Sequence, residues 1–131
     1  GRRGFLRVIY LDTHVVIWLY SGEVDRFSPR AVKLIETEDL KISPAVILET
    51  EYLYEAGKIT VEASAIVEYL ESALGLLVCE VGFHRVAVEA LALRWTRAPF
   101  DRLIVAHAKA TDCILVSRDT NIREHYHKAV W

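Results

Sequence analysis

Short apolar runs alternate with longer stretches of helical periodicity along the chain. The apolar runs predict strands over residues 8–11, 40–42, 76–81, 114–116 and, at the end, 128–131. Helical patterns lie between them, over residues 13–20, 29–37, 44–57, 61–73, 83–95 and 100–111, with a short helical turn over 119–126. Because strands separated by helices need crossover connections, the pattern predicts an α/β fold, a parallel sheet with helices on both faces.

Several helix starts are marked by residues that favour an amino-terminal cap. Ser28-Pro29 and Ser43-Pro44 each combine a capping hydroxyl with a proline in the first turn, and Thr60 precedes the helix expected from Val61. In open sheets of this class the functional crevice lies outside the carboxyl ends of the strands. Polar residues that directly follow a strand are therefore the first candidates for a site.

Composition limits the size of the protein and the kind of partner it can bind. A chain of 131 residues, 53% hydrophobic and 26% charged, fits a single domain over residues 1–131. Its formal net charge of -2 offers no broad basic field, so a phosphate-bearing partner must be bound locally. The apolar runs are too short to span a bilayer and no signal-peptide pattern opens the chain, so we expect a soluble, cytoplasmic protein with no membrane partner.

Three smaller features carry no chemistry in this interpretation. Cys79 and Cys113 each lie in an apolar, strand-like run, where a free cysteine behaves as a small hydrophobic residue. Residues 1–4 are either native sequence, a disordered end or a cloning remnant, and no prediction rests on them.

Three aspartates stand at positions that the predicted fold brings toward one edge of the sheet. Asp12 directly follows the first strand, and Asp119 comes three residues after the fourth. Asp101 lies on the helical stripe that packs toward the sheet, together with Ile104, Val105 and Ala108. Each has an alternative role, because Asp12 and Asp119 could cap the next helix and Asp101 could be a favourable charge at a helix start.

Glu49 and Glu51 compete for an inward position on one predicted helix. They are two positions apart, about 200° around the helix axis, so both cannot face the sheet. Glu49 shares its side of the helix with three apolar or aromatic residues, Val46, Tyr52 and Leu53. We therefore expect Glu49 to point inward, whereas Glu55 and Glu62 are expected to be solvated.

Four carboxylates on four different elements are thus expected at the same edge of the sheet: Asp12, Glu49, Asp101 and Asp119. At about 5 Å, each pair would repel by roughly 3 kcal/mol at an effective dielectric near 20, so such a cluster needs protonation or a bound cation. Oxygen-only ligands favour Mg²⁺ or Mn²⁺, and the corresponding chemistry is phosphodiester hydrolysis. Thr13 and Ser117 have hydroxyls beside these acids and could support the water of such a site, or serve only as cap and turn residues.

Four segments of the chain resemble the motif regions of VapC-type toxins, a branch of the PIN-domain ribonucleases. They are YLDTHVVIWL (10–19), SPAVILETEYLYEAGKI (43–59), APFDRLIVAHA (98–108) and LVSRD (115–119). The resemblance covers nearly the whole chain, and LDTH together with PFDR is fairly specific for this branch. It implies a three-layer α/β/α PIN fold with about five parallel strands, and a catalytic Mg²⁺ or Mn²⁺ site at Asp12, Glu49, Asp101 and Asp119.

The same resemblance implies an activity and partners. Members of this branch are metal-dependent RNA endonucleases that form homodimers and are inhibited by a cognate VapB-type antitoxin. We therefore expect an RNA substrate, a VapB-like antitoxin and a second copy of this chain as partners.

Basic and aromatic residues near the acidic motifs are candidates for substrate or partner contacts. Arg102 and Arg118 each adjoin a motif aspartate and are predicted to hold phosphate. His14 could touch substrate, although a histidine at a helix start more often packs or caps. Aromatic side chains on helical stretches could line a groove for a partner peptide, with core packing for at least half of them: Trp18, Tyr20, Tyr52 and Tyr54.

Two functions from other classes compete with the nuclease. The first is a non-catalytic PIN-fold module that binds protein or RNA; the complete set of four carboxylates argues against it. The second is a phosphoacceptor signalling domain, which needs an acceptor aspartate at the end of the third strand. This chain has Glu80-Val81-Gly82 there, so that class is disfavoured.

Overall fold

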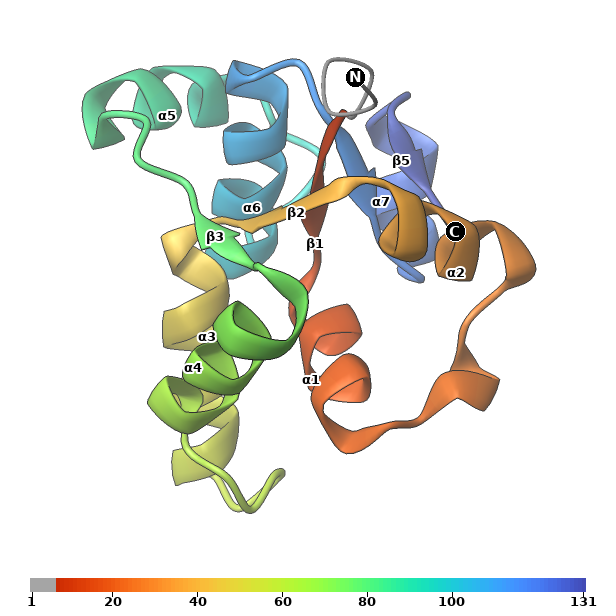
Figure 1. The fold of residues 1–131 in the computed structure, drawn as a ribbon. Coiled ribbons are helices and arrows are strands. Elements are labelled where there is room, and N and C mark those ends of the chain that lie inside the picture. Colours follow the sequence, from red (N-terminus) through yellow and green to blue (C-terminus); the bar gives the residue numbers. More distant parts are fainter. Residues whose placement is uncertain (1–6) are drawn as a thin grey trace.

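Five short parallel strands form one sheet in the order β3-β2-β1-β4-β5 (Figure 1). The computed structural model describes residues 7–131, so the expectation for residues 1–4 lies outside the described part. The strands are β1 (Val8–Leu11), β2 (Asp39–Ile42), β3 (Leu77–Val78), β4 (Ile114–Val116) and β5 (Ala129–Val130). The predicted parallel α/β fold is confirmed.

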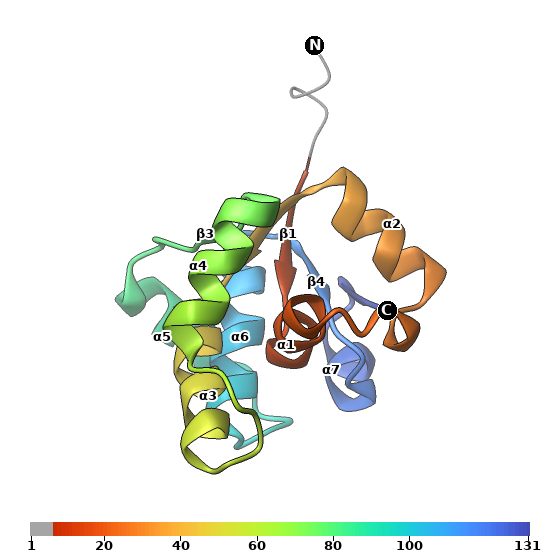
Figure 2. The same cartoon turned by 60° about the horizontal axis from the view of Figure 1, so that its bottom comes forward.

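Within residues 7–131, seven α-helices surround the sheet and cover both of its faces (Figure 1). Their bounds are α1 (Thr13–Ser21), α2 (Pro29–Thr37), α3 (Pro44–Glu55), α4 (Ala63–Leu74), α5 (Phe83–Leu91), α6 (Pro99–Ala110) and α7 (Thr120–His125). In both views α3 and α6 lie on one side of α1, and α7 lies on its other side (Figure 2). Helix α3 packs against both α1 and α6, which ties together the elements that carry three of the four predicted carboxylates.

The strand order has a reversal point at β1. The chain builds β2 and β3 outward on one side of β1, and then places β4 and β5 on the other. In parallel sheets, ligand crevices form outside the carboxyl ends of the strands where the order reverses. Doubly wound phosphoacceptor-type sheets have the order 2-1-3-4-5, so the observed order also excludes that class.

The core lies along the two central strands. The side chains of Ile9, Leu11, Leu115 and Val116 are fully buried, which requires helices on both faces of the sheet. Cys79 is buried and Cys113 is partly buried, and both are free thiols, as expected of small hydrophobic residues. None of the helices within residues 7–131 combines the length and apolarity that a bilayer crossing requires.

The predicted caps are partly correct. Ser28 accepts from Ala31 N–H at 3.0 Å and Ser43 accepts from Ala45 N–H at 3.0 Å. The prediction that Thr60 caps a helix from Val61 is wrong, because α4 begins at Ala63 and its capping position is Glu62. The acceptor comes from a different helix instead: Glu51 Oε1, on α3, accepts from Ala63 N–H at 3.0 Å.

Two predicted elements are longer than those observed. The helix expected over 83–95 ends at Leu91, where the carbonyls of its last turn accept from the Arg102 guanidinium: Ala90 O at 2.8 Å and Leu91 O at 3.3 Å. The strand expected over 76–81 is only Leu77–Val78, because its partner β2 ends at Ile42 and gives way to α3. Both differences come from tertiary contacts that local periodicity does not encode.

We predict that Glu51→Ala lowers the free energy of unfolding by about 1 kcal/mol, because the first turn of α4 loses its acceptor. Urea denaturation followed by circular dichroism measures this. The exposed Glu55, at the carboxyl end of the same helix, provides the control: Glu55→Ala should change stability by no more than a few tenths of a kcal/mol. Equal effects of the two substitutions would show that the Glu51 cap contributes nothing.

Candidate functional site

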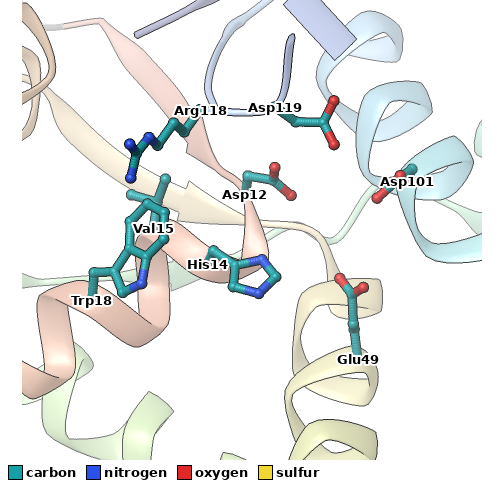
Figure 3. A pocket seen from close by; sticks show the side chains of 8 residues that line it. All are labelled: Asp12, His14, Val15, Trp18, Glu49, Asp101, Arg118 and Asp119. Carbon is teal, nitrogen blue, oxygen red and sulfur yellow. The ribbon is translucent and has the colours of Figure 1, made fainter. Parts of the chain in front are cut away.

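A cavity of about 520 Å³ opens at the reversal point, outside the carboxyl ends of β1 and β4. All four predicted carboxylates line it (Figure 3). The full lining is Asp12, His14, Val15, Trp18, Glu49, Asp101, Arg118 and Asp119. We call this cavity the acidic pocket.

Asp12 is the most deeply placed of the four acids, with 8% of its surface exposed. It follows β1 directly, and its N–H donates to Val116 O of β4 at 3.0 Å. Its carboxylate accepts from Thr13 N–H at 2.9 Å, which caps α1, and from the Ser117 hydroxyl at 2.7 Å. Burial raises the pKa of Asp12 despite these hydrogen bonds, so the ionised form is held at a free-energy cost.

Glu49 reaches the acidic pocket from α3, and the predicted choice between Glu49 and Glu51 is confirmed. Thr13 Oγ1 donates to Glu49 Oε1, which links the start of α1 to the middle of α3. Burial is the main cause that raises the pKa of Glu49, and the negative charge of Asp12 raises it further. Thr13 is therefore the first residue of α1 and also orients the carboxylate of Glu49.

Asp101 lies on the first turn of α6, and the stripe it shares with Ile104, Val105 and Ala108 is fully buried. Burial and then the negative charges of Asp12, Glu49 and Asp119 raise the pKa of Asp101 to about 6. All three neighbours act in the same direction, which is the signature of carboxylates that repel one another in a shared pocket. The predicted clustering of the four acids is thus present in the structure.

Asp119 caps a helix and also lies in the acidic pocket. Its carboxylate caps α7 by accepting from Ile122 N–H at 3.0 Å, and it also lines the acidic pocket. The Ser117 hydroxyl accepts from Asp119 N–H at 3.1 Å while it donates to Asp12. Ser117 therefore joins the loop after β4 to the carboxylate after β1.

A buried polar contact sets the distance between the two helices that bring Glu49 and Asp101. Ser43 Oγ and His107 Nδ1 lie 2.7 Å apart, joining the start of α3 to α6. Both residues are buried, and burial lowers the pKa of His107. His107 therefore has a structural role in this helix contact.

The two predicted phosphate-binding arginines have different positions. Arg118 lines the acidic pocket on the side opposite Asp101 and Glu49 (Figure 3). Arg102 does not line it, because its guanidinium donates to the carbonyls at the end of α5. The predicted role of Arg102 in phosphate binding is therefore corrected to a helix-capping role.

Sequence reasoning missed Trp18 as a pocket residue and treated it as core or partner-binding. His14 and Trp18 are four residues apart on α1, so they lie on the same face of a helix that begins directly after Asp12. Their rings are neighbours, with centroids 5.8 Å apart. The four-residue spacing from His14 could have identified Trp18 as a pocket residue, since the face of α1 that carries His14 also faces the acidic pocket.

The donor set of the acidic pocket fits a hard divalent cation. All its acidic side chains offer oxygen, and positive charge among them would relieve the repulsion that raises the pKa of Asp101. Within residues 7–131, no three acidic, histidine or cysteine side chains are already converged in a metal-binding arrangement. A cation would therefore draw the carboxylates together from Asp12, Glu49, Asp101 and Asp119.

The fold and the site define a class of α/β protein: a parallel sheet of order 3-2-1-4-5 with a carboxylate-lined pocket at its reversal point. Comparison with known proteins agrees with this class. Residues 9–128 match the family model of the PIN domain. The chain is also 32% identical over 126 residues to Ribonuclease VapC22 of Mycobacterium tuberculosis, an alignment that covers 93% of this chain and 95% of that protein. The chain belongs to the PIN-domain family, on its VapC-type branch.

Solved structures share the fold. The crystal structure of VapBC2 from Rickettsia felis, bound to a DNA fragment from its promoter, matches with a TM-score of 0.64 and 17% identity, covering 90% of this chain and 92% of the other. DNA-bound VapBC from Salmonella typhimurium matches with a TM-score of 0.62 and 20% identity, covering 95% of each chain. The three-layer PIN-like α/β/α architecture is thereby confirmed.

We predict that Asp101 stabilises the metal-free protein progressively as the pH falls from about 7 to about 5. In the folded chain the pKa of Asp101 is about 6, above its usual 3.8. Between these two values the folded state binds more protons than the unfolded state, so the free energy of unfolding decreases as the pH rises. Urea denaturation in EDTA at several pH values measures this slope.

Asp101→Asn is the matched variant for this experiment. The buried His107 and the surface carboxylates Glu23 and Asp112, all with lowered pKa values, act in the opposite direction. The difference in slope between wild type and variant therefore isolates the contribution of Asp101. The variant should lose part of the slope and melt on the order of a few degrees higher near pH 7. A lower melting temperature would mean that Asp101 stabilises the fold and that repulsion does not dominate.

Proposed function

We propose that this chain is a VapC-type RNA endonuclease that hydrolyses phosphodiester bonds with Mg²⁺ or Mn²⁺. The observation that carries the proposal is the acidic pocket, where Asp12, Glu49, Asp101 and Asp119 meet beside one arginine. The similarity to a protein named as a ribonuclease, over nearly the full length of both chains, supports the same activity.

The residues of the acidic pocket divide the work of such a reaction. The four carboxylates would hold the cation, and a bound cation would supply activation of water and neutralisation of charge on a phosphoryl oxygen. Thr13 and Ser117 orient Glu49 and Asp12 through their hydroxyls and so preset two of the ligands. Arg118 is placed to contact a phosphate of the RNA backbone by charge-assisted hydrogen bonds.

The proposal of a VapC-type nuclease also leads to proposals for the partners and the cellular location of the chain. Two of the solved structures that share this fold are VapBC structures with DNA bound, which supports a VapB-like antitoxin as the inhibitor of this chain. We also propose a homodimer, a single PIN domain over residues 1–131 and a cytoplasmic location. RNA is the proposed substrate, held locally because the net charge is -2.

We predict that the purified protein, freed of any antitoxin, cleaves a mixed pool of small RNAs with Mg²⁺ or Mn²⁺ and is inactive in EDTA. Asp101→Asn should reduce cleavage roughly a hundredfold or more, because the variant loses a charged ligand. Glu49→Gln should do the same, whereas Glu51→Gln, two positions away on the same helix, should retain activity. Gel analysis of the RNA products measures all of these.

The outcomes of this experiment separate the two remaining functions. Metal-dependent cuts that vanish in Asp101→Asn establish the nuclease and its site together. Absence of cleavage by a folded, antitoxin-free protein would contradict the nuclease and favour a non-catalytic PIN module that binds protein or RNA.

We predict that Arg118→Gln and Arg102→Gln have opposite profiles. Arg118→Gln should raise KM for RNA about tenfold with little change in melting temperature, because a phosphate contact is lost. Arg102→Gln should lower the melting temperature and leave KM unchanged, because its hydrogen bonds are to the end of α5. Thermal melts and initial rates on one labelled RNA distinguish the two. An Arg102 variant with impaired KM would restore the phosphate role predicted from the sequence.

A further inference from the structure

The acidic pocket has two chemically different sides. Glu49 and Asp101 lie on one side, and Trp18 and Arg118 lie together on the other, with Asp12 between them (Figure 3). The proposed metal chemistry uses the acidic side. Arg118 has a proposed role in phosphate binding, whereas the indole of Trp18 lines the cavity and has no role in this chemistry.

We propose that the indole of Trp18, with Arg118 beside it, is a stacking surface for the nucleobase next to the cleaved phosphate. This inference rests on the proposed RNA substrate and names the residue that would bind its base. Aromatic rings and arginine planes are the surfaces on which proteins stack unpaired RNA bases.

The orientation of the Trp18 ring is fixed by neighbours away from the acids. Phe27 and Trp131 contact it with centroid distances of 6.3 and 6.0 Å, and these two rings also pack on each other at 5.6 Å. Trp18 is partly exposed, while its edge-on packing anchors it. A rigid, half-exposed ring can stack on a base without first losing conformational freedom.

Two guanidinium groups already pair with this indole. The Cζ atom of Arg26 lies 5.2 Å from the ring centroid, and that of Arg118 lies 5.8 Å from it. These contacts are cation–π interactions, in which planar groups already pack against the indole. Arg118 can contact both the phosphate and the base of a bound nucleotide, since it lines the acidic pocket and lies over the indole.

The charge balance of the acidic pocket favours a base on this wall. Four carboxylates face a single arginine in the lining, so phosphates alone are poorly held without a cation. A neutral base that stacks adds affinity which does not depend on charge, on the order of ten- to a hundredfold per stacked base. The cavity, at about 520 Å³, is within the range of small-molecule sites of roughly 300–1,000 Å³.

The test measures binding apart from cleavage. Labelled hexa-adenylate and hexa-uridylate are titrated by fluorescence anisotropy into the Asp101→Asn protein with Mg²⁺, where the probe stays intact. Trp18→Leu should weaken hexa-adenylate binding roughly tenfold or more, and Trp18→Phe should retain most of it, because a ring remains. Hexa-adenylate should bind better than hexa-uridylate, since purines present a larger stacking surface, and Trp18→Leu should abolish this preference.

Tyr20→Leu is the matched control, because Tyr20 lies on the same helix as Trp18, packs on Tyr69 and does not line the acidic pocket. It should lower the melting temperature about as much as Trp18→Leu and leave both affinities unchanged. If the two leucine variants lose affinity equally, Trp18 is only structural and the inference is wrong. Failure of hexa-adenylate to bind the Asp101→Asn protein would overturn it as well.

The inference and the proposed nuclease can fail separately. RNA cleavage by the wild type, with affinities insensitive to Trp18, would keep the nuclease and remove the stacking surface. A Trp18-dependent affinity in a protein that cuts no RNA would keep the stacking surface and point to an RNA-binding module.

Discussion

Strand β1 lies between β2 and β4, and its pairing with β4 continues past the strand end, where Asp12 N–H donates to Val116 O at 3.0 Å. This register places the residues after β1 and β4 side by side, and Ser117 links Asp12 to Asp119 by donating to the first and accepting from the N–H of the second. Crossover helices run back against the strands, so α3 and α6 begin at the same edge and bring Glu49 and Asp101 to it. The site therefore depends on parallel pairing at the point where the strand order reverses.

Gathering four acids in this way opposes folding, and the structure offsets only part of the cost. Hydroxyl groups satisfy two of the carboxylates, from Thr13 to Glu49 and from Ser117 to Asp12, yet burial still raises the pKa of both acids. Neither hydroxyl neutralises charge, so the repulsion remains for a cation to relieve. Stability and cation binding are thus coupled through the same side chains, since whatever lowers the repulsion stabilises the folded chain.

The sequence predicted well what local periodicity and strand ends determine. The central strands and the inward position of Glu49 follow from the spacing of apolar residues, because these positions pack on the sheet. The Ser28 and Ser43 caps follow from the Ser-Pro pairs that mark a helix start. It failed where a distant residue supplies a hydrogen bond. Glu51 replaces the expected Thr60 cap of α4, and Arg102 satisfies the end of α5, which removes that arginine from the site. Such contacts depend on how helices are placed in space, which one sequence does not report.

Two of the four acids and the aromatic side of the acidic pocket come from the same two junctions. Asp12 and Trp18 lie at the start of α1 and one to two turns along it, and Arg118 and Asp119 are neighbours after β4. The proposed stacking surface and two of the proposed metal ligands are therefore fixed relative to each other by a nine-residue helix and one loop. A change that shifts α1 would move a carboxylate and the indole together, whereas a change in α3 or α6 would move Glu49 or Asp101 alone. Placement of a base and of the phosphate beside it is thus a single property of the β1–β4 edge.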